Sequence, residues 1–242
     1  MRSPSPVGKT VATVLAAGAL ACAPAASIAC EHATPQQIAD ALAASPTLNS
    51  GLKSCAMAAM AMNESGGGNT CAQNNCCIGV LQVNASSGGL NWNAAQRQAY
   101  LNSDLQTQIN SWASVANSNA SSTGYQTLLS AYNSGQTVSG YTVTPGLLAA
   151  CEQFGPGVCN SNVAALKSTG SCGGAADGNG QTICSWGAAT DRQASKQNCS
   201  LNSNSGVVQC GPGDFPPGPP VASNATPPSA TSADLNLPAN AG

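Results

Sequence analysis

The chain has 242 residues, of which only 7% are charged, and its formal net charge is −2. This length accommodates one domain of ordinary size together with additional segments. Seven Lys and Arg stand against nine Asp and Glu, and no three basic residues lie together. The composition therefore argues against nucleic acid or anionic membrane as the main partner.

The N-terminus has the pattern of a secretory signal peptide, which we place at residues 1–29. Arg2 and Lys9 provide the positive end, and a ten-residue apolar stretch and small residues follow. We expect cleavage after Ala29, with Ala21 as the alternative. An apolar stretch this short is not expected to span a membrane. The predicted location is the periplasm or the extracellular space.

Twelve cysteines in a chain with an export signal indicate an oxidising compartment and disulfide bonds. Cleavage after Ala29 leaves eleven, so either one thiol is free or cleavage follows Ala21 and retains Cys22. A lipid on Cys22 or Cys30 is a further alternative, which the residues before each cysteine do not favour. The pairing stays open at this stage.

A capped helix is predicted next, because Thr34, Pro35 and Gln37 have the residue types of a helix start. It ends before Pro46. A second helix is expected over 50–65, and a short apolar run over 78–84 lies between turn residues. Further helices are expected near 94–101, 104–116, 125–132, 145–153 and 163–167. The sequence thus predicts a mainly α domain over residues 30–169, with one short hairpin or irregular insert.

One acid lies on the apolar face of the second helix. Leu52, Ala56, Met60 and Glu64 are spaced four apart, so they share one face. Burial would raise the pKa of Glu64, as would the negative end of the helix dipole. A carboxyl that stays partly protonated near neutral pH can act as a general acid. Taken alone, a solvated helix end is the simpler interpretation.

The C-terminal part has a different composition. Residues 170–210 contain four cysteines and little apolar content, which predicts a small Cys-rich module held by two disulfides. Residues 211–242 contain eight of the fifteen prolines, which predicts a disordered or polyproline-like tail.

Three short motifs follow one another at a specific spacing: Glu64-Ser65, then Gly79-Val-Leu-Gln82, then Ala131-Tyr-Asn-Ser-Gly135. Each is weak alone. In this order, and with eighteen residues from Glu64 to Gln82, they resemble the goose-lysozyme-like lytic transglycosylases that cut bacterial peptidoglycan. Asn84 is similar to the residue found in members associated with conjugation and secretion machines. The resemblance covers about residues 38–135.

The resemblance implies a lysozyme-like helical fold and a role for each motif. Glu64 would protonate the glycosidic oxygen between N-acetylmuramic acid and N-acetylglucosamine, then accept a proton from the sugar's 6-hydroxyl, leaving a 1,6-anhydro end. Ser65 would orient Glu64 or a sugar, Gln82 would line the cleft, and Tyr132 would place its hydroxyl near the Glu64 carboxyl. Asn133 would hold backbone or substrate. The implied partners are peptidoglycan glycan strands and a secretion or conjugation envelope complex.

Cys77 bears on the mechanism. Ordinary glycosidases use two carboxylates, and animal-type lysozymes place an Asp two residues before the glycine of the second motif, where this chain has Cys77. The nearest acids on either side of Glu64 in sequence, Asp40 and Asp104, lie on predicted helix surfaces. We therefore expect one-carboxylate catalysis, in which the substrate supplies the nucleophile.

Some features depart from the family pattern. Cys76 and Cys77 replace Gly and Ala, and Gly66-Gly-Gly68 replaces bulkier residues; both bear on the shape of the subsites. Tyr141 is the candidate for the last cleft tyrosine. The alternative function is an inactive lysozyme-like domain that binds glycan or serves envelope assembly.

No metal or other cofactor is expected. His32 is the only histidine and lies near the mature N-terminus. Cys71, Cys76 and Cys77 have a spacing that a metal could use, but export favours disulfides.

Overall fold

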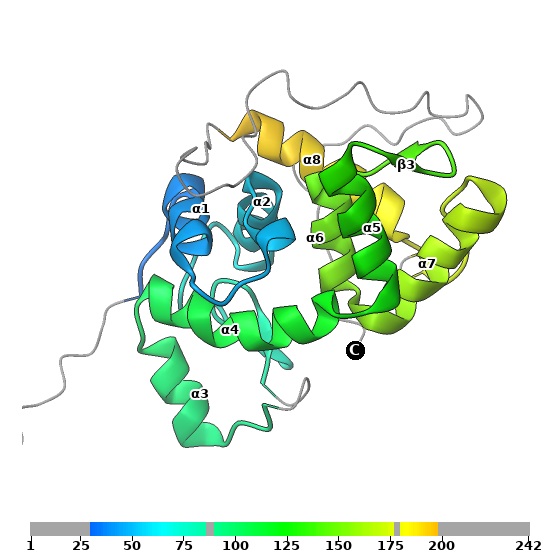
Figure 1. Ribbon diagram of the computed structural model, residues 1–242. Helices are drawn as coiled ribbons and strands as arrows, with labels where there is room; N and C mark the ends of the chain where they lie inside the picture. Colours follow the sequence, from blue (N-terminus) through cyan, green and yellow to red (C-terminus); the bar gives the residue numbers. More distant parts are fainter. Residues whose placement is uncertain (1–29, 86–89, 177–179, 198–242) are drawn as a thin grey trace, which may run out of the picture.

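The computed structural model describes residues 30–85, 90–176 and 180–197, and these are mainly helical (Figure 1). The expected signal peptide, the expected proline-rich tail and the end of the expected Cys-rich module lie outside this part of the chain. The helices are α1 (Pro35–Ala44), η1 (Ser50–Leu52, a 3₁₀-helix), α2 (Cys55–Glu64), α3 (Ala94–Leu101), α4 (Leu105–Ala120), α5 (Thr123–Ser134), α6 (Pro145–Gln153), α7 (Gly155–Thr169) and α8 (Ile183–Lys196).

Two short antiparallel hairpins complete the described residues. Strand β1 (Cys77–Ile78) pairs with β2 (Val83–Asn84), and β3 (Thr137–Val138) pairs with β4 (Tyr141–Thr142). The first hairpin lies where a short insert was expected. The prediction of a mainly α domain with a short hairpin insert is confirmed.

Polar caps fix the helix starts that the sequence indicates. The Thr34 hydroxyl accepts from the N–H of Gln37, and the Gln37 side chain accepts from the N–H of Thr34, so the capping box at α1 is present. At α2 the Ser54 hydroxyl accepts from the N–H of Met57, without a reciprocal side-chain bond. Because Ser54 breaks the expected helix over 50–65, that segment forms two pieces, η1 and α2.

Helix α6 lies at the centre of the core. Its residues from Pro145 to Glu152 are buried, because α2, α5, α7 and α8 all pack against it. In Figure 1, α1, α2, α6 and α5 stand roughly side by side, with α4 across their lower ends and α8 across the upper ends of α2 and α6. None of the described helices is long and apolar enough to cross a bilayer.

Two glycines allow α6 and α8 to cross in backbone contact. A Cβ atom on Gly187 would lie 2.8 Å from the Cα of Leu147, and one on Gly146 would collide with the Gly187 carbonyl oxygen. The N–H of Gly146 donates to Oδ1 of Asp191 at 2.7 Å, so α8 also supplies a cap for α6.

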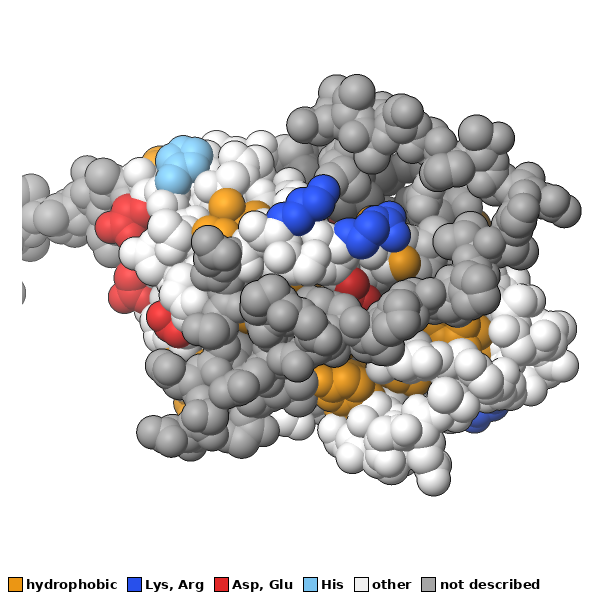
Figure 2. All heavy atoms as spheres, turned by 90° about the horizontal axis from the view of Figure 1, so that it is seen from above, with side chains coloured by type: hydrophobic (Ala, Val, Ile, Leu, Met, Phe, Trp, Pro, Cys, Tyr) orange, Lys and Arg blue, Asp and Glu red, His pale blue; other side chains and the backbone are white. Residues whose placement is uncertain are grey.

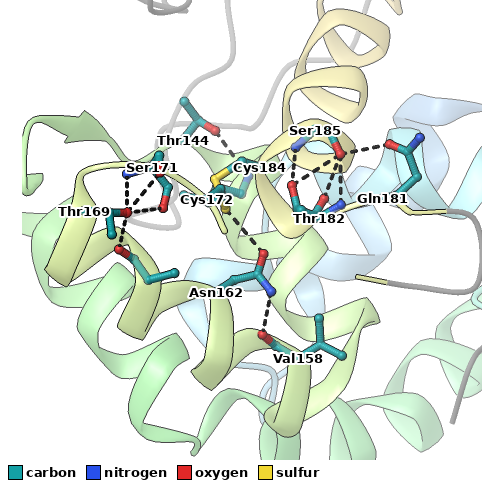
Figure 3. The surroundings of a disulfide bond; sticks show 12 residues. Thr144, Val158, Asn162, Thr169, Ser171, Cys172, Gln181, Thr182, Cys184 and Ser185 are labelled. Carbon is teal, nitrogen blue, oxygen red and sulfur yellow. Dashed lines mark hydrogen bonds between the residues drawn. A yellow bond between two sulfur atoms is a disulfide. The ribbon is translucent and has the colours of Figure 1, made fainter. Parts of the chain in front are cut away.

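Residues 170–197 are part of the same core, within the described ranges. Ile183, Trp186 and Ala194 of α8 are buried among the core side chains. Cys172 is bonded to Cys184, beside Asn162 of α7 (Figure 3). The packing thus continues past residue 170, into the segment where the sequence predicts a small Cys-rich module.

All nine cysteines in the described ranges are in disulfides. Four pairs are Cys30–Cys71, Cys76–Cys77, Cys151–Cys159 and Cys172–Cys184, and Cys55 is also in a disulfide. The expectation that disulfides stabilise the domain is consistent with these bonds.

We expect Gly187→Ala to lower the free energy of unfolding by about 1–3 kcal/mol, because the added methyl group forces α6 and α8 apart. Gly157→Ala is the matched control: it lies in the first turn of α7 with nothing within 4 Å of the added Cβ. That variant should gain about 0.5 kcal/mol from helix propensity. Chemical denaturation of both variants measures the difference, and equal stability for the two would contradict the close crossing.

Candidate active site

Glu64 is the last residue of α2, at the end of a buried face. Leu52, Ala56 and Met60, the other members of the predicted apolar row, are at most 1% exposed, whereas Glu64 is half-buried. The helix stops there because three glycines with positive φ follow Ser65. The sequence prediction of an acid on a buried helix face is confirmed.

Burial raises the pKa of Glu64 from its ordinary value of 4.5 to about 7. The direction is the one expected from the sequence. Near neutral pH the carboxyl is therefore present in both protonation states. A residue needs both states if it first donates and then accepts a proton.

Glu152, on α6, is a second acid that the sequence analysis did not identify. Its side chain is 3% exposed, and Oε1 accepts from Nδ2 of Asn119 at 3.3 Å, whereas Oε2 is buried without a hydrogen-bond partner. Burial raises the pKa of Glu152 to about 7; the hydrogen bond from Asn119 lowers it, and the charge of Glu64 raises it. The two carboxyls thus interact electrostatically, and a negative charge on Glu64 favours the protonated form of Glu152.

A buried tyrosine lies beside this second acid. Tyr125 is fully buried, its hydroxyl has no hydrogen-bond partner, and its pKa is raised by burial and by the charge of Glu152. Tyr125 and Glu152 thus interact electrostatically, and each has a buried oxygen without a hydrogen-bond partner. A neutral Glu152 costs far less to bury there than a charged one.

Asp191, on α8, is a third buried acid with a structural role. Burial raises its pKa to about 6, against the opposing effects of hydrogen bonds from Thr144 and Gly146 and of the Arg192 charge. Its contact with the first turn of α6 makes it a helix cap. Tyr141, the candidate cleft tyrosine, is half-buried, and its pKa is raised by burial and by the charge of Asp191.

The Ser65 hydroxyl holds the glycine turn that follows Glu64. It donates to the carbonyl oxygen of Ala61 at 2.6 Å and accepts from the N–H of Gly68 at 2.8 Å. Gly68 cannot carry a side chain, because a Cβ would collide with the carbonyl oxygen of Ala33. Ser65 thereby fixes the backbone beside the candidate acid.

Gln82 is buried in the loop between β1 and β2, directly before β2. Its Nε2 donates to the carbonyl oxygens of Gly79 at 2.8 Å and Ala72 at 3.3 Å, and its Oε1 accepts from Nδ2 of Asn74 at 3.0 Å. It is 4% exposed and has a φ of 46°. The amide of Gln82 is therefore engaged in holding this loop.

Tyr132 and Asn133, of the third motif, lie on α5. Tyr132 is half-buried and packs against the core, and Asn133 is exposed. Helix α6 packs against α5 on one side and against α2 on another. Helix α6, which carries Glu152, thus packs against both the helix of the first motif and the helix of the third.

A polar groove of about 730 Å³ lies over α5, the β3–β4 hairpin and the end of α7. Thr127, Ser130, Gln136 and Ser139 contribute hydroxyl and amide groups, and Lys167 is the one charged residue of its lining. The Lys167 ammonium donates to the Thr127 hydroxyl at 3.2 Å. Ala131 of the third motif also lines the groove, whereas none of the five expected site residues does.

Charged side chains are sparse on the face seen in Figure 2, where uncharged polar and hydrophobic atoms make up most of the described surface. Across residues 30–85, 90–176 and 180–197, no cluster of three metal-ligating side chains occurs.

Comparison of the chain with protein families, with curated proteins and with solved structures finds no match.

We expect the free energy of unfolding to fall as pH rises from about 4.5 to 7, because the unfolded chain releases the Glu152 proton first. Glu152→Gln removes this ionisation. Between pH 4.5 and pH 7, the free energy of unfolding should therefore fall less in the variant than in the wild type. The difference between the two decreases should be up to about 3 kcal/mol.

The measurement is denaturant unfolding across this pH range. The matched control is Glu31→Gln, which removes an exposed acid. If the curves of unfolding free energy against pH were parallel for wild type and Glu152→Gln, burial would not raise the pKa of Glu152.

Proposed function

We propose that the chain is an exported peptidoglycan lytic transglycosylase that cleaves the β-1,4 bond between N-acetylmuramic acid and N-acetylglucosamine. The observation that carries this proposal is the half-buried Glu64 carboxyl, whose pKa is about 7, at a helix end that three glycines of positive φ follow. The order and spacing of the three sequence motifs add the substrate class. A lysozyme-like fold and a part in a secretion or conjugation envelope complex belong to the same proposal.

Glu64 performs both proton transfers in the proposed reaction. The protonated carboxyl donates to the glycosidic oxygen as the bond to the anomeric carbon breaks. The resulting carboxylate then accepts the proton of the sugar's 6-hydroxyl, whose oxygen attacks the anomeric carbon and closes the 1,6-anhydro ring. No water is consumed, and Glu64 returns to its protonated form.

The burial of Glu152 supports a mechanism with one working carboxylate. Hydrolytic glycosidases need a second carboxyl that reaches either the anomeric carbon or an attacking water. Glu152 is 3% exposed and is bonded to Asn119, so it reaches neither. Its proposed role is to influence the charge of Glu64 from within the core.

Export is proposed from the signal-like N-terminus, and the disulfides of the described residues are consistent with it. Disulfides persist in oxidising compartments, which include the periplasm and the extracellular space.

Glu64→Gln should lower the release of anhydro-ended fragments from purified peptidoglycan by at least a factor of about 100, because the general acid is lost. Mass spectrometry distinguishes these products, which are one water lighter than hydrolytic products. Glu31→Gln should keep wild-type activity. Release of water-added, reducing-end products alone by the wild type would overturn the transglycosylase proposal.

The polar groove over α5 favours a second candidate, a glycan-binding protein without cleavage. In that case Lys167→Ala should weaken binding to peptidoglycan fragments by about three- to tenfold through the loss of a charged hydrogen-bond donor. Lys196→Ala, at the exposed end of α8, is the matched control. Binding by calorimetry that is unaffected by Glu64→Gln, with no cleavage products, would select this candidate.

A further inference from the structure

The disulfide between Cys76 and Cys77 joins neighbouring residues. Cys77 is fully buried and forms the start of β1, where it pairs with Asn84. Cys76 is partly exposed. One sulfur of the bond is therefore accessible from outside, and the other is fixed in the protein.

The side chain of Asn74 ties this disulfide to the second sequence motif. Its Oδ1 accepts from the N–H groups of Cys76 at 3.0 Å and Cys77 at 2.8 Å, and its Nδ2 donates to Oε1 of Gln82. The N–H of Asn74 also donates to the Cys77 carbonyl oxygen at 2.9 Å. The disulfide, Asn74 and Gln82 thus form one hydrogen-bonded unit.

This bond is a poor stabiliser of the fold. A disulfide stabilises a protein mainly by closing a loop in the unfolded chain, and the effect grows with loop length. Cys30–Cys71 spans a separation of 41 residues and Cys172–Cys184 one of 12, whereas Cys76–Cys77 spans 1. Opening it therefore leaves the global fold in place and changes only its own loop.

We propose that Cys76–Cys77 is a reversible redox site, which a dithiol reductant opens, and that its opening releases the Asn74–Gln82 unit. The inference does not depend on the proposed glycan cleavage. It assigns a function to the vicinal cysteines, which that reaction does not use.

The exchange proceeds in two steps at sulfur. A thiolate of the reductant attacks Sγ of Cys76, a mixed disulfide forms, and the Cys76–Cys77 bond breaks with Cys77 leaving as thiolate. The second thiol of the reductant then attacks the reductant sulfur that is bonded to Cys76, and Cys76 leaves as a thiolate. The protein gains two electrons and the two thiol protons, and the reductant becomes a disulfide. Cys76 is the attacked atom because Cys77 is inaccessible.

Differential alkylation in graded mixtures of reduced and oxidised dithiothreitol tests the site on the full chain. Peptide mass spectrometry should find Cys76 and Cys77 labelled at reductant levels that leave Cys30–Cys71 and Cys172–Cys184 closed. The latter two pairs are the internal controls, because each has a partly exposed cysteine. Labelling of Cys76 and Cys77 together with these pairs, or after them, would overturn the proposal.

Hydrogen–deuterium exchange tests the coupling to Gln82. In the selectively reduced protein and in the double variant Cys76→Ser, Cys77→Ser, the N–H groups of Gly79 and Gln82 should exchange about tenfold faster than in the oxidised wild type. Asn74→Ala should have the same effect without reduction, and the amides of α4 should not change in any of them. Unchanged exchange at Gly79 and Gln82 in both the reduced protein and the double variant would show that the disulfide does not control this loop.

Discussion

The backbones of α6 and α8 touch where Gly187 faces Leu147, because neither Gly146 nor Gly187 has a side chain to hold them apart. This approach places Asp191 against the first turn of α6 and covers a helix that has no solvent-facing side from Pro145 to Glu152. It also sets α8 beside α2, because both helices pack against α6 and against each other. The position of the candidate acid on α2 thus depends on a contact made by two glycines on other helices.

Three acids lie on these three adjacent helices, and each is held where its charged form is costly. Asp191 recovers part of that cost through the hydrogen bonds of a helix cap, and Glu152 recovers less through Asn119 alone. Glu64 is the one of the three with substantial exposure. Burial raises the pKa of all three carboxyls, and pKa values perturbed in this way are frequently associated with acid–base function.

The sequence predicted the elements whose signals are local. The Thr34 cap, the helix over 94–101 and the row ending at Glu64 were read from residue types and spacing, and the structure confirms them. Helix α8 was not predicted, because Gly187 and Thr190 are residue types common in loops. Ile183, Trp186 and Ala194 nevertheless follow helical spacing, and packing against α6 stabilises the helix. Glu152 stands four residues after Leu148 on a buried helix, so the reasoning applied to Glu64 would have found it. Its interaction with Glu64 is a long-range contact that spacing alone does not reveal.

The contact between α2 and α8 also governs the order in which the protein can fold. Gln193 of α8 donates to Asn63, the residue before Glu64, across a separation of 130 residues. Closing so long a loop has an entropic cost that must be met before the contact is gained, so such pairings form late. During synthesis from the N-terminus, the apolar helix 55–64 is complete long before α8 exists to cover it. The face of α2 that packs against α8 therefore stays uncovered until residues 183–196 emerge, although α1 can already pack against α2. We expect chaperone protection to matter most in that interval.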